Sequence, residues 1–178
     1  MQPTDFDITL LRILNKTFSP QISLFFVFIV YSLYMFVLLS IFYFWKSRQK
    51  KRLAHFITVL AVGLLLIYFL KYSIARPRPH ELYPDIKTGI IKTDPSFPSS
   101  HVLVSFLCIY FLPKRPKFAR FLTIFYLTIL IPFGSLYIGV HYPSDIIVAA
   151  IIGILLPILI SEKIVFGTIK KISPFLAM

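Results

Sequence analysis

The chain has 178 residues, of which 57% are hydrophobic and only 15% are charged, and its mean hydropathy is +0.81. A soluble domain of this size could not bury so much apolar surface, so the composition predicts an integral membrane protein. The net charge of +12 does not indicate nucleic-acid binding, because the basic residues gather in short segments between apolar runs. The single cysteine, Cys108, excludes an intrachain disulfide and a thiolate zinc cluster.

The N-terminal segment, residues 1–18, is expected to form an amphipathic helix at the membrane surface. Ile8, Leu11, Leu14 and Phe18 recur at helical spacing, with Leu10 beside them. The segment is too polar to cross a bilayer, so it is predicted to be interfacial, where it could shape the entrance for a lipid.

Five apolar runs follow, at about 21–45, 54–75, 99–112, 121–139 and 146–161. The sequence therefore predicts an all-α integral membrane bundle of about five transmembrane helices plus the interfacial helix, in a single domain spanning 1–178. Basic residues concentrate in 46–52, in 113–120 and in the tail after 161. The positive-inside rule places these segments in the cytoplasm, and puts the N-terminus and the segments 76–98 and 141–145 outside.

The third apolar run is short for a transmembrane helix. Residues 99–112 would cover about 21 Å as a helix, against a hydrocarbon core of about 30 Å. The fifth run is nearly as short, and both are bounded on the cytoplasmic side by cations. Their outer ends, which carry His101 and Asp145, are therefore predicted to lie below the outer membrane surface, in a polar pocket.

The polar residues at these outer ends have the chemistry of a phosphate site. Lysine and arginine bind phosphate oxygens, and the free N–H groups at a helix start also favour an anion. Of two histidines, one could attack phosphorus and the other could protonate a leaving oxygen, while a carboxylate four residues after a histidine can orient its ring. The candidates are Lys71, Arg78, Ser99, Ser100, His101, His141 and Asp145.

Each of these features alone has a structural alternative. Lys71 and Arg78 could extend to the membrane surface by snorkelling, and Arg76 could be such a residue, a rim contact or an additional phosphate contact. Ser99 could cap a helix, and Asp145 could cap a turn. Their occurrence at one predicted face of the membrane favours a functional site.

Three motifs resemble the signatures of the type 2 phosphatidic acid phosphatase family. They are Lys71-x6-Arg78-Pro79, Pro98-Ser99-Ser100-His101 and His141-x3-Asp145, within residues 54–161. The resemblance implies an all-helical phosphatase that uses neither a metal nor another cofactor. It implies that His141 is a nucleophile forming a phosphohistidine, Asp145 its orienting partner and His101 the general acid. It also implies phosphate binding by Lys71, Arg78 and Ser99, with the backbone of Ser100 available in place of the family's usual glycine.

One position departs from the family pattern. Ser135 stands where the family has a phosphate-binding arginine, and Gly134 stands where it has serine. Arg76 or Lys92 could replace this cation, or the substrate could carry less charge.

The expected function is a metal-independent lipid phosphate phosphatase. Its substrate would be a polyprenyl diphosphate, lipid A 1-phosphate, phosphatidylglycerol phosphate or phosphatidic acid. The expected location is a bacterial inner membrane, with the active site on the periplasmic face; the bilayer and the lipid phosphate are the partners, and nucleic acid is not. The alternatives are a lipid phosphotransferase and a catalytically inactive lipid- or anion-binding membrane protein.

Overall fold

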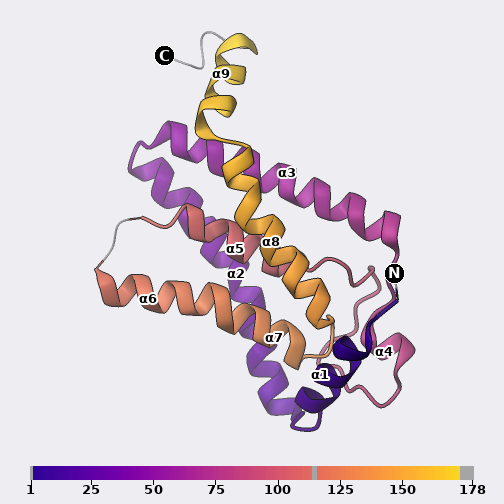
Figure 1. Cartoon of the computed structure of the whole chain (residues 1–178). Helices are drawn as coiled ribbons and strands as arrows, with labels where there is room; N and C mark the ends of the chain where they lie inside the picture. Colours follow the sequence, from indigo (N-terminus) through magenta and orange to yellow (C-terminus); the bar gives the residue numbers. More distant parts are fainter. Residues whose placement is uncertain (1, 114–115, 173–178) are drawn as a thin grey trace.

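The computed structural model describes residues 2–113 and 116–172, and over these ranges the chain forms helices and no strand (Figure 1). The elements are α1 (Asp5–Asn15), α2 (Pro20–Lys46), α3 (Lys50–Ile74), α4 (Pro79–Leu82), α5 (Ser100–Tyr110), α6 (Lys117–Phe125), the π-helical η1 (Tyr126–Leu130), α7 (Ile131–Tyr137), α8 (Pro143–Leu159) and α9 (Glu162–Ile172). The prediction of an all-α membrane bundle is confirmed.

Three stretches in the described ranges are apolar and long enough to cross a bilayer, and a bent pair of helices can supply a fourth. The three are Pro20–Lys46, Lys50–Leu82 and Lys117–Tyr137; the pair is Pro143–Leu159 with Glu162–Thr168, bent by 57°. Large apolar side chains such as Phe28 and Leu65 are about 70% exposed, as side chains facing lipid would be. The count is lower than the five runs predicted, because the third run forms a helix of only 11 residues.

That short helix, α5, lies in the middle of the bundle (Figure 1). It packs against α2, α3, α7, η1 and α8, and seven of its eleven residues are buried. Its contact with α8 is especially close at Gly153, where an added Cβ would lie 2.5 Å from the backbone oxygen of Leu103. Because protein surrounds α5, its first turn lies inside the bundle and can form one wall of a buried site.

The fourth apolar run is one continuous helical stretch interrupted by the π-helical segment η1. No residue of α6, which precedes η1, is buried. In α7, which follows η1, the buried residues are Ile131, Pro132, Gly134, Ser135 and Tyr137. A π-helical turn inserts a residue into the α-helical repeat and so rotates the face that follows. Here the rotation turns the end of the stretch toward the protein interior.

The predicted N-terminal helix is present as α1, and it packs against α7 and α8. A capping box begins it: Asp7 N donates to Thr4 Oγ1 (3.2 Å), and Thr4 N donates to Asp7 Oδ2 (3.1 Å). Leu11 is buried as its spacing predicted, whereas Phe18 lies beyond the helix end. The helix is therefore docked on the protein, and its position in the bilayer stays a prediction.

The C-terminal helix α9 lies beyond the predicted elements, which end at residue 161 and leave the basic residues after it as a tail. Glu162 lies in its first turn, where a carboxylate stabilises the helix dipole, and Val165 is buried. In the sequence, Glu162 and Val165 were the residues that could have indicated this helix. The helix packs against α3.

Candidate active site

The segments carrying the three motifs meet at one end of the bundle, near α4 and the start of α8 (Figure 1). Arg78 Nη1 donates a hydrogen bond to Val140 O (2.7 Å), which joins the first motif to the third. Ser99 N lies 3.3 Å from Asp145 O and donates to it, which joins the second motif to the third. The structure thus brings together the residues that the sequence analysis selected from three distant parts of the chain.

His141 and Asp145 are both buried and face each other. His141 Nδ1 lies 3.4 Å from Asp145 Oδ2, and the same oxygen accepts a hydrogen bond from Tyr142 N (2.9 Å). Asp145 therefore caps the start of α8, as the structural alternative proposed, and also contacts the histidine. A histidine whose Nδ1–H is held by a carboxylate has its Nε2 lone pair available for reaction.

Arg76 is not at the rim of the site, and the expectation of a snorkelling residue or rim contact is wrong. Its side chain is completely buried between two carboxylates, with Nη1 2.6 Å from Asp145 Oδ1 and Nη2 2.8 Å from Asp7 Oδ2. Its guanidinium also lies 4.2 Å from the ring centre of Tyr142. Burial is possible because two anions compensate the desolvation of this cation. A role for Arg76 as an additional phosphate contact stays a prediction.

Asp7 is the site residue that sequence reasoning missed. It contacts Arg76 and also Ser144, whose N and Oγ both donate to its carboxylate at 2.8 Å. Although burial raises the pKa of Asp7, these hydrogen bonds and those from Thr4 and Arg76 lower it below its ordinary value. The sequence feature that could have indicated this role is the carboxylate at the third position of a capping box. Because such a carboxylate is already explained by capping its own helix, it does not by itself indicate a site residue.

Lys71 and Arg78 are also buried, so the snorkelling alternative is wrong for both. The same loop holds them: Asp94 lies 2.9 Å from Lys71 Nζ and 2.8 Å from Arg78 Nη2, through its two carboxylate oxygens. Lys71 also donates to Pro95 O, and Arg78 Nε donates to Asp94 O at 2.7 Å. Burial raises the pKa of Asp94, but the hydrogen bond from Lys71 and the charges of Arg78 and Lys71 outweigh it and lower the pKa to about 2.

Ser99 and His101 each present a buried polar atom that has no hydrogen-bond partner in the described part of the chain. These atoms are Ser99 Oγ and His101 Nε2. Ser99 occupies the cap position of α5, yet its side chain makes no capping hydrogen bond, so the simple helix-cap alternative is wrong. An unpaired buried polar atom is costly, and a bound ligand that supplies the missing partner is one explanation for it. Ser100 follows as the first residue of α5.

Aromatic rings from α2 enclose His101. The ring centres of Tyr31 and Tyr34 lie 5.4 and 5.3 Å from that of the histidine, and Lys92 Nζ lies 5.4 Å from the centre of Tyr31. Burial, followed by repulsion from Arg78, lowers the pKa of Lys92 to about 8. These contacts place Lys92 beside the aromatic rings that cover His101.

Ser135, at the position where the family has an arginine, carries no charge into this environment. It is buried, and its Oγ donates to Ile131 O (2.9 Å) within its own helix. Its hydroxyl is therefore already paired.

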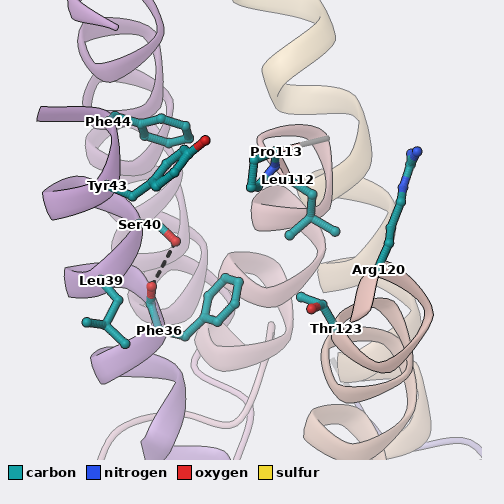
Figure 2. Close-up of a pocket in the computed structure, with 9 residues that line it drawn as sticks. All are labelled: Phe36, Leu39, Ser40, Tyr43, Phe44, Leu112, Pro113, Arg120 and Thr123. Atoms are coloured by element: carbon teal, nitrogen blue, oxygen red, sulfur yellow. Dashed lines mark hydrogen bonds between the residues drawn. The ribbon is translucent and has the colours of Figure 1, made fainter. Parts of the chain in front are cut away.

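A cavity of about 150 Å³ lies elsewhere, between α2, the end of α5 and α6 (Figure 2). Its lining is mostly apolar, and the Ser40 hydroxyl beside it is already donated to Phe36 O (2.8 Å). None of the motif residues lines it. The described residues also contain no group of three His, Cys, Asp or Glu side chains that could hold a metal ion. The candidate active site is therefore the motif cluster at the other end of α5, and independence of metals stays a prediction.

The model of the PAP2 superfamily matches residues 52–166, a region that contains all three motifs. The chain belongs to the PAP2 superfamily. An undecaprenyl-diphosphatase of Sulfolobus acidocaldarius is 30% identical to this PAP2 chain over 132 residues, which cover 73% of the chain. The match covers 64% of that relative, so the chain spans somewhat less than two thirds of its length.

Two crystal structures resemble this chain in fold. LpxE of Aquifex aeolicus superposes with a TM-score of 0.78 at 25% identity, covering 90% of this chain and 97% of that one. The transmembrane PAP2-type phosphatidylglycerolphosphate phosphatase of Bacillus subtilis superposes with a TM-score of 0.70 at 22% identity, covering 95% and 87%. The second likeness establishes the fold alone. Together they agree with the multi-pass membrane bundle described above.

Proposed function

We propose that this PAP2 protein is a metal-independent phosphatase of membrane lipid phosphates that works through a phosphohistidine on His141. The observation that carries the proposal is the composition of one buried cluster. It combines a histidine held by a carboxylate, two buried cations, and the unpaired polar atoms of Ser99 and His101. A phosphate group would give those atoms partners and would meet positive charge at the same time.

In the first step His141 Nε2 attacks phosphorus, and the bond from phosphorus to the lipid oxygen breaks. Asp145 keeps the Nδ1 proton on the far side of the ring and stabilises the positive charge that develops on it. His101 transfers a proton to the departing lipid oxygen. Lys71, Arg78, Ser99 and the N–H groups at the start of α5 stabilise the oxygens of the phosphoryl group.

In the second step water attacks the phosphohistidine. His101, now neutral, accepts a proton from the water, the N–P bond breaks, and inorganic phosphate leaves with His141 restored. An acceptor alcohol in place of water would make the same intermediate a phosphotransferase. Assaying lipid acceptors beside water distinguishes the two reactions.

A polyprenyl diphosphate is the first substrate to test, because the sequence relative is named an undecaprenyl-diphosphatase. With this substrate the leaving group is a lipid monophosphate. Lipid A 1-phosphate, phosphatidylglycerol phosphate and phosphatidic acid belong in the same panel. The basic segments at 46–52 and 113–120 support an active site on the extracytoplasmic face, and a bacterial inner membrane stays the predicted location.

The test is phosphate release by the purified protein in detergent containing EDTA. We expect release from at least one lipid of the panel, its loss in His141→Ala, and its retention in His80→Ala, a histidine of α4 outside the motifs. Acid-labile, base-stable phosphate on the protein during turnover would support the intermediate. Release that EDTA abolishes or that His141→Ala retains would refute the mechanism, and no release from any lipid would favour the anion-binding alternative.

A further inference from the structure

A continuous buried chain of charges leads from the N-terminal helix to the proposed nucleophile. Asp7 on α1 pairs with Arg76, Arg76 pairs with Asp145, and Asp145 contacts His141. The side chains of Asp7, Arg76 and Asp145 are all 0% exposed. Asp7 lies two links away from His141 and touches neither the histidine nor the two cations Lys71 and Arg78.

The charges in this chain do not cancel. Two carboxylates face one guanidinium, so Asp7, Arg76 and Asp145 together carry one net negative charge, which the two carboxylates share. Without Asp7, the full charge of Arg76 would act on Asp145 at 2.6 Å and would neutralise it. A neutralised pair would stabilise the positive charge on a phosphorylated imidazole less well than a carboxylate whose cation is shared.

Asp7 also fixes the residue that precedes Asp145. Its carboxylate accepts from Ser144 N and Ser144 Oγ at 2.8 Å each, and Ser144 Oγ in turn accepts from Arg76 Nη1 at 2.7 Å. These contacts set the first turn of α8, from which the Asp145 side chain projects. Asp7 therefore influences both the charge that Asp145 presents to His141 and the position of the Asp145 side chain.

We propose that Asp7 is a positioning residue for the reaction, which shares Arg76 with Asp145 so that Asp145 remains an effective anionic partner of His141. The N-terminal helix then has a role in catalysis besides any contact with lipid. This inference rests on the proposed function of His141 as the nucleophile. If Asp7 only fastened α1 to the bundle, its loss would lower stability without specifically changing the catalytic step.

The decisive variant is Asp7→Asn, which keeps the size of the side chain and an oxygen acceptor but removes the charge. Asp7→Glu restores the charge, and Asp5→Asn removes an exposed carboxylate from the same first turn of α1. We expect Asp7→Asn to lower kcat about 10- to 100-fold, the range found when outer carboxylate partners of metal-bound histidines are removed. KM should change less than about twofold because phosphate contacts remain, and Asp7→Glu should recover part of kcat.

A spectroscopic readout makes the test independent of turnover. The chain has four histidines, so the ¹⁵N signals of labelled imidazoles can be assigned with His141→Ala. In folded Asp7→Asn, the His141 Nδ1 signal should move toward that of a ring with a weaker hydrogen bond, and Asp5→Asn should leave it in place. An unchanged His141 signal together with a normal kcat would overturn the inference, as would loss of kcat only in proportion to loss of folded protein.

The two proposals can fail separately. An active enzyme that depends on His141 but tolerates Asp7→Asn would refute the positioning role and leave the proposed function standing. A protein without phosphatase activity whose His141 signal still responds to Asp7→Asn would refute the function and leave the coupling in place.

Discussion

Replacing Asp94 by asparagine should strengthen the binding of phosphate. The carboxylate pairs with Lys71 and Arg78, the two cations proposed to bind substrate, so an incoming phosphate competes with it. Asp94 is 42% exposed, and a partly exposed ion pair contributes about 0.2–1 kcal/mol. Two such pairs give about 0.4–2 kcal/mol, which corresponds to about two- to thirtyfold in affinity. The pKa of about 2 keeps Asp94 ionised throughout the physiological range, so the competition does not depend on pH there.

The assay is calorimetric titration of orthovanadate or inorganic phosphate into detergent-solubilised protein, with product inhibition measured in parallel. Asp94→Asn should lower both the dissociation constant and the inhibition constant. Asp94→Glu, which keeps the charge, should stay near the wild type. The matched control is Asp85→Asn in the same loop, because Asp85 pairs with Arg12 away from the cations. Weaker phosphate binding in Asp94→Asn would refute the reasoning and would show that Asp94 mainly holds the two cations in place.

Three further outcomes follow from the site and its packing. Lys92 is a possible replacement for the family's missing arginine, and its pKa is about 8. If its charge assists substrate binding, kcat/KM should fall as the pH rises through 8, and Lys92→Arg should move that fall to higher pH. His101→Ala should impair lipid phosphates with poor leaving groups much more than activated aryl phosphates; equal damage to both in a steady-state comparison would remove the general-acid assignment. Gly153→Ala should destabilise the protein by about 1–3 kcal/mol in thermal unfolding, because its methyl group would meet the backbone of Leu103. Gly167→Ala, with open space around it, is the control.

The helices could be predicted from sequence where lipid sets the pattern. The runs that became α2 and α3 are continuous and apolar because their faces meet hydrocarbon, and hydropathy detects that directly. The π-helical segment η1 and the 11-residue length of α5 depend on packing against neighbours, which hydropathy does not record. The helix α9 was missed for a similar reason, since its polar residues resembled a tail.

The site could be predicted as far as its residue types were unusual for a membrane segment. His101, His141 and Asp145 stood out because ionisable groups at membrane depth are rare. Arg76 was misjudged and Asp7 was overlooked, because they pair with each other across 69 residues of the chain. Each residue also had an ordinary local explanation. A buried ion pair between residues far apart in the chain produces no regular spacing in the sequence, so the sequence pattern cannot predict it.

The short α5 has a consequence for how the protein is made. A helix of 11 residues does not span the hydrocarbon core, so the insertion machinery could not recognise it as a membrane segment on its own. Its place between the other helices depends on α8, because Gly153 of α8 allows the two helices to pack closely. The ribosome completes α8 about 50 residues after α5. We therefore expect the first turn of α5, with Ser99 and His101, to reach its final position only after α8 has entered the membrane, so that the proposed phosphate site is completed late in synthesis.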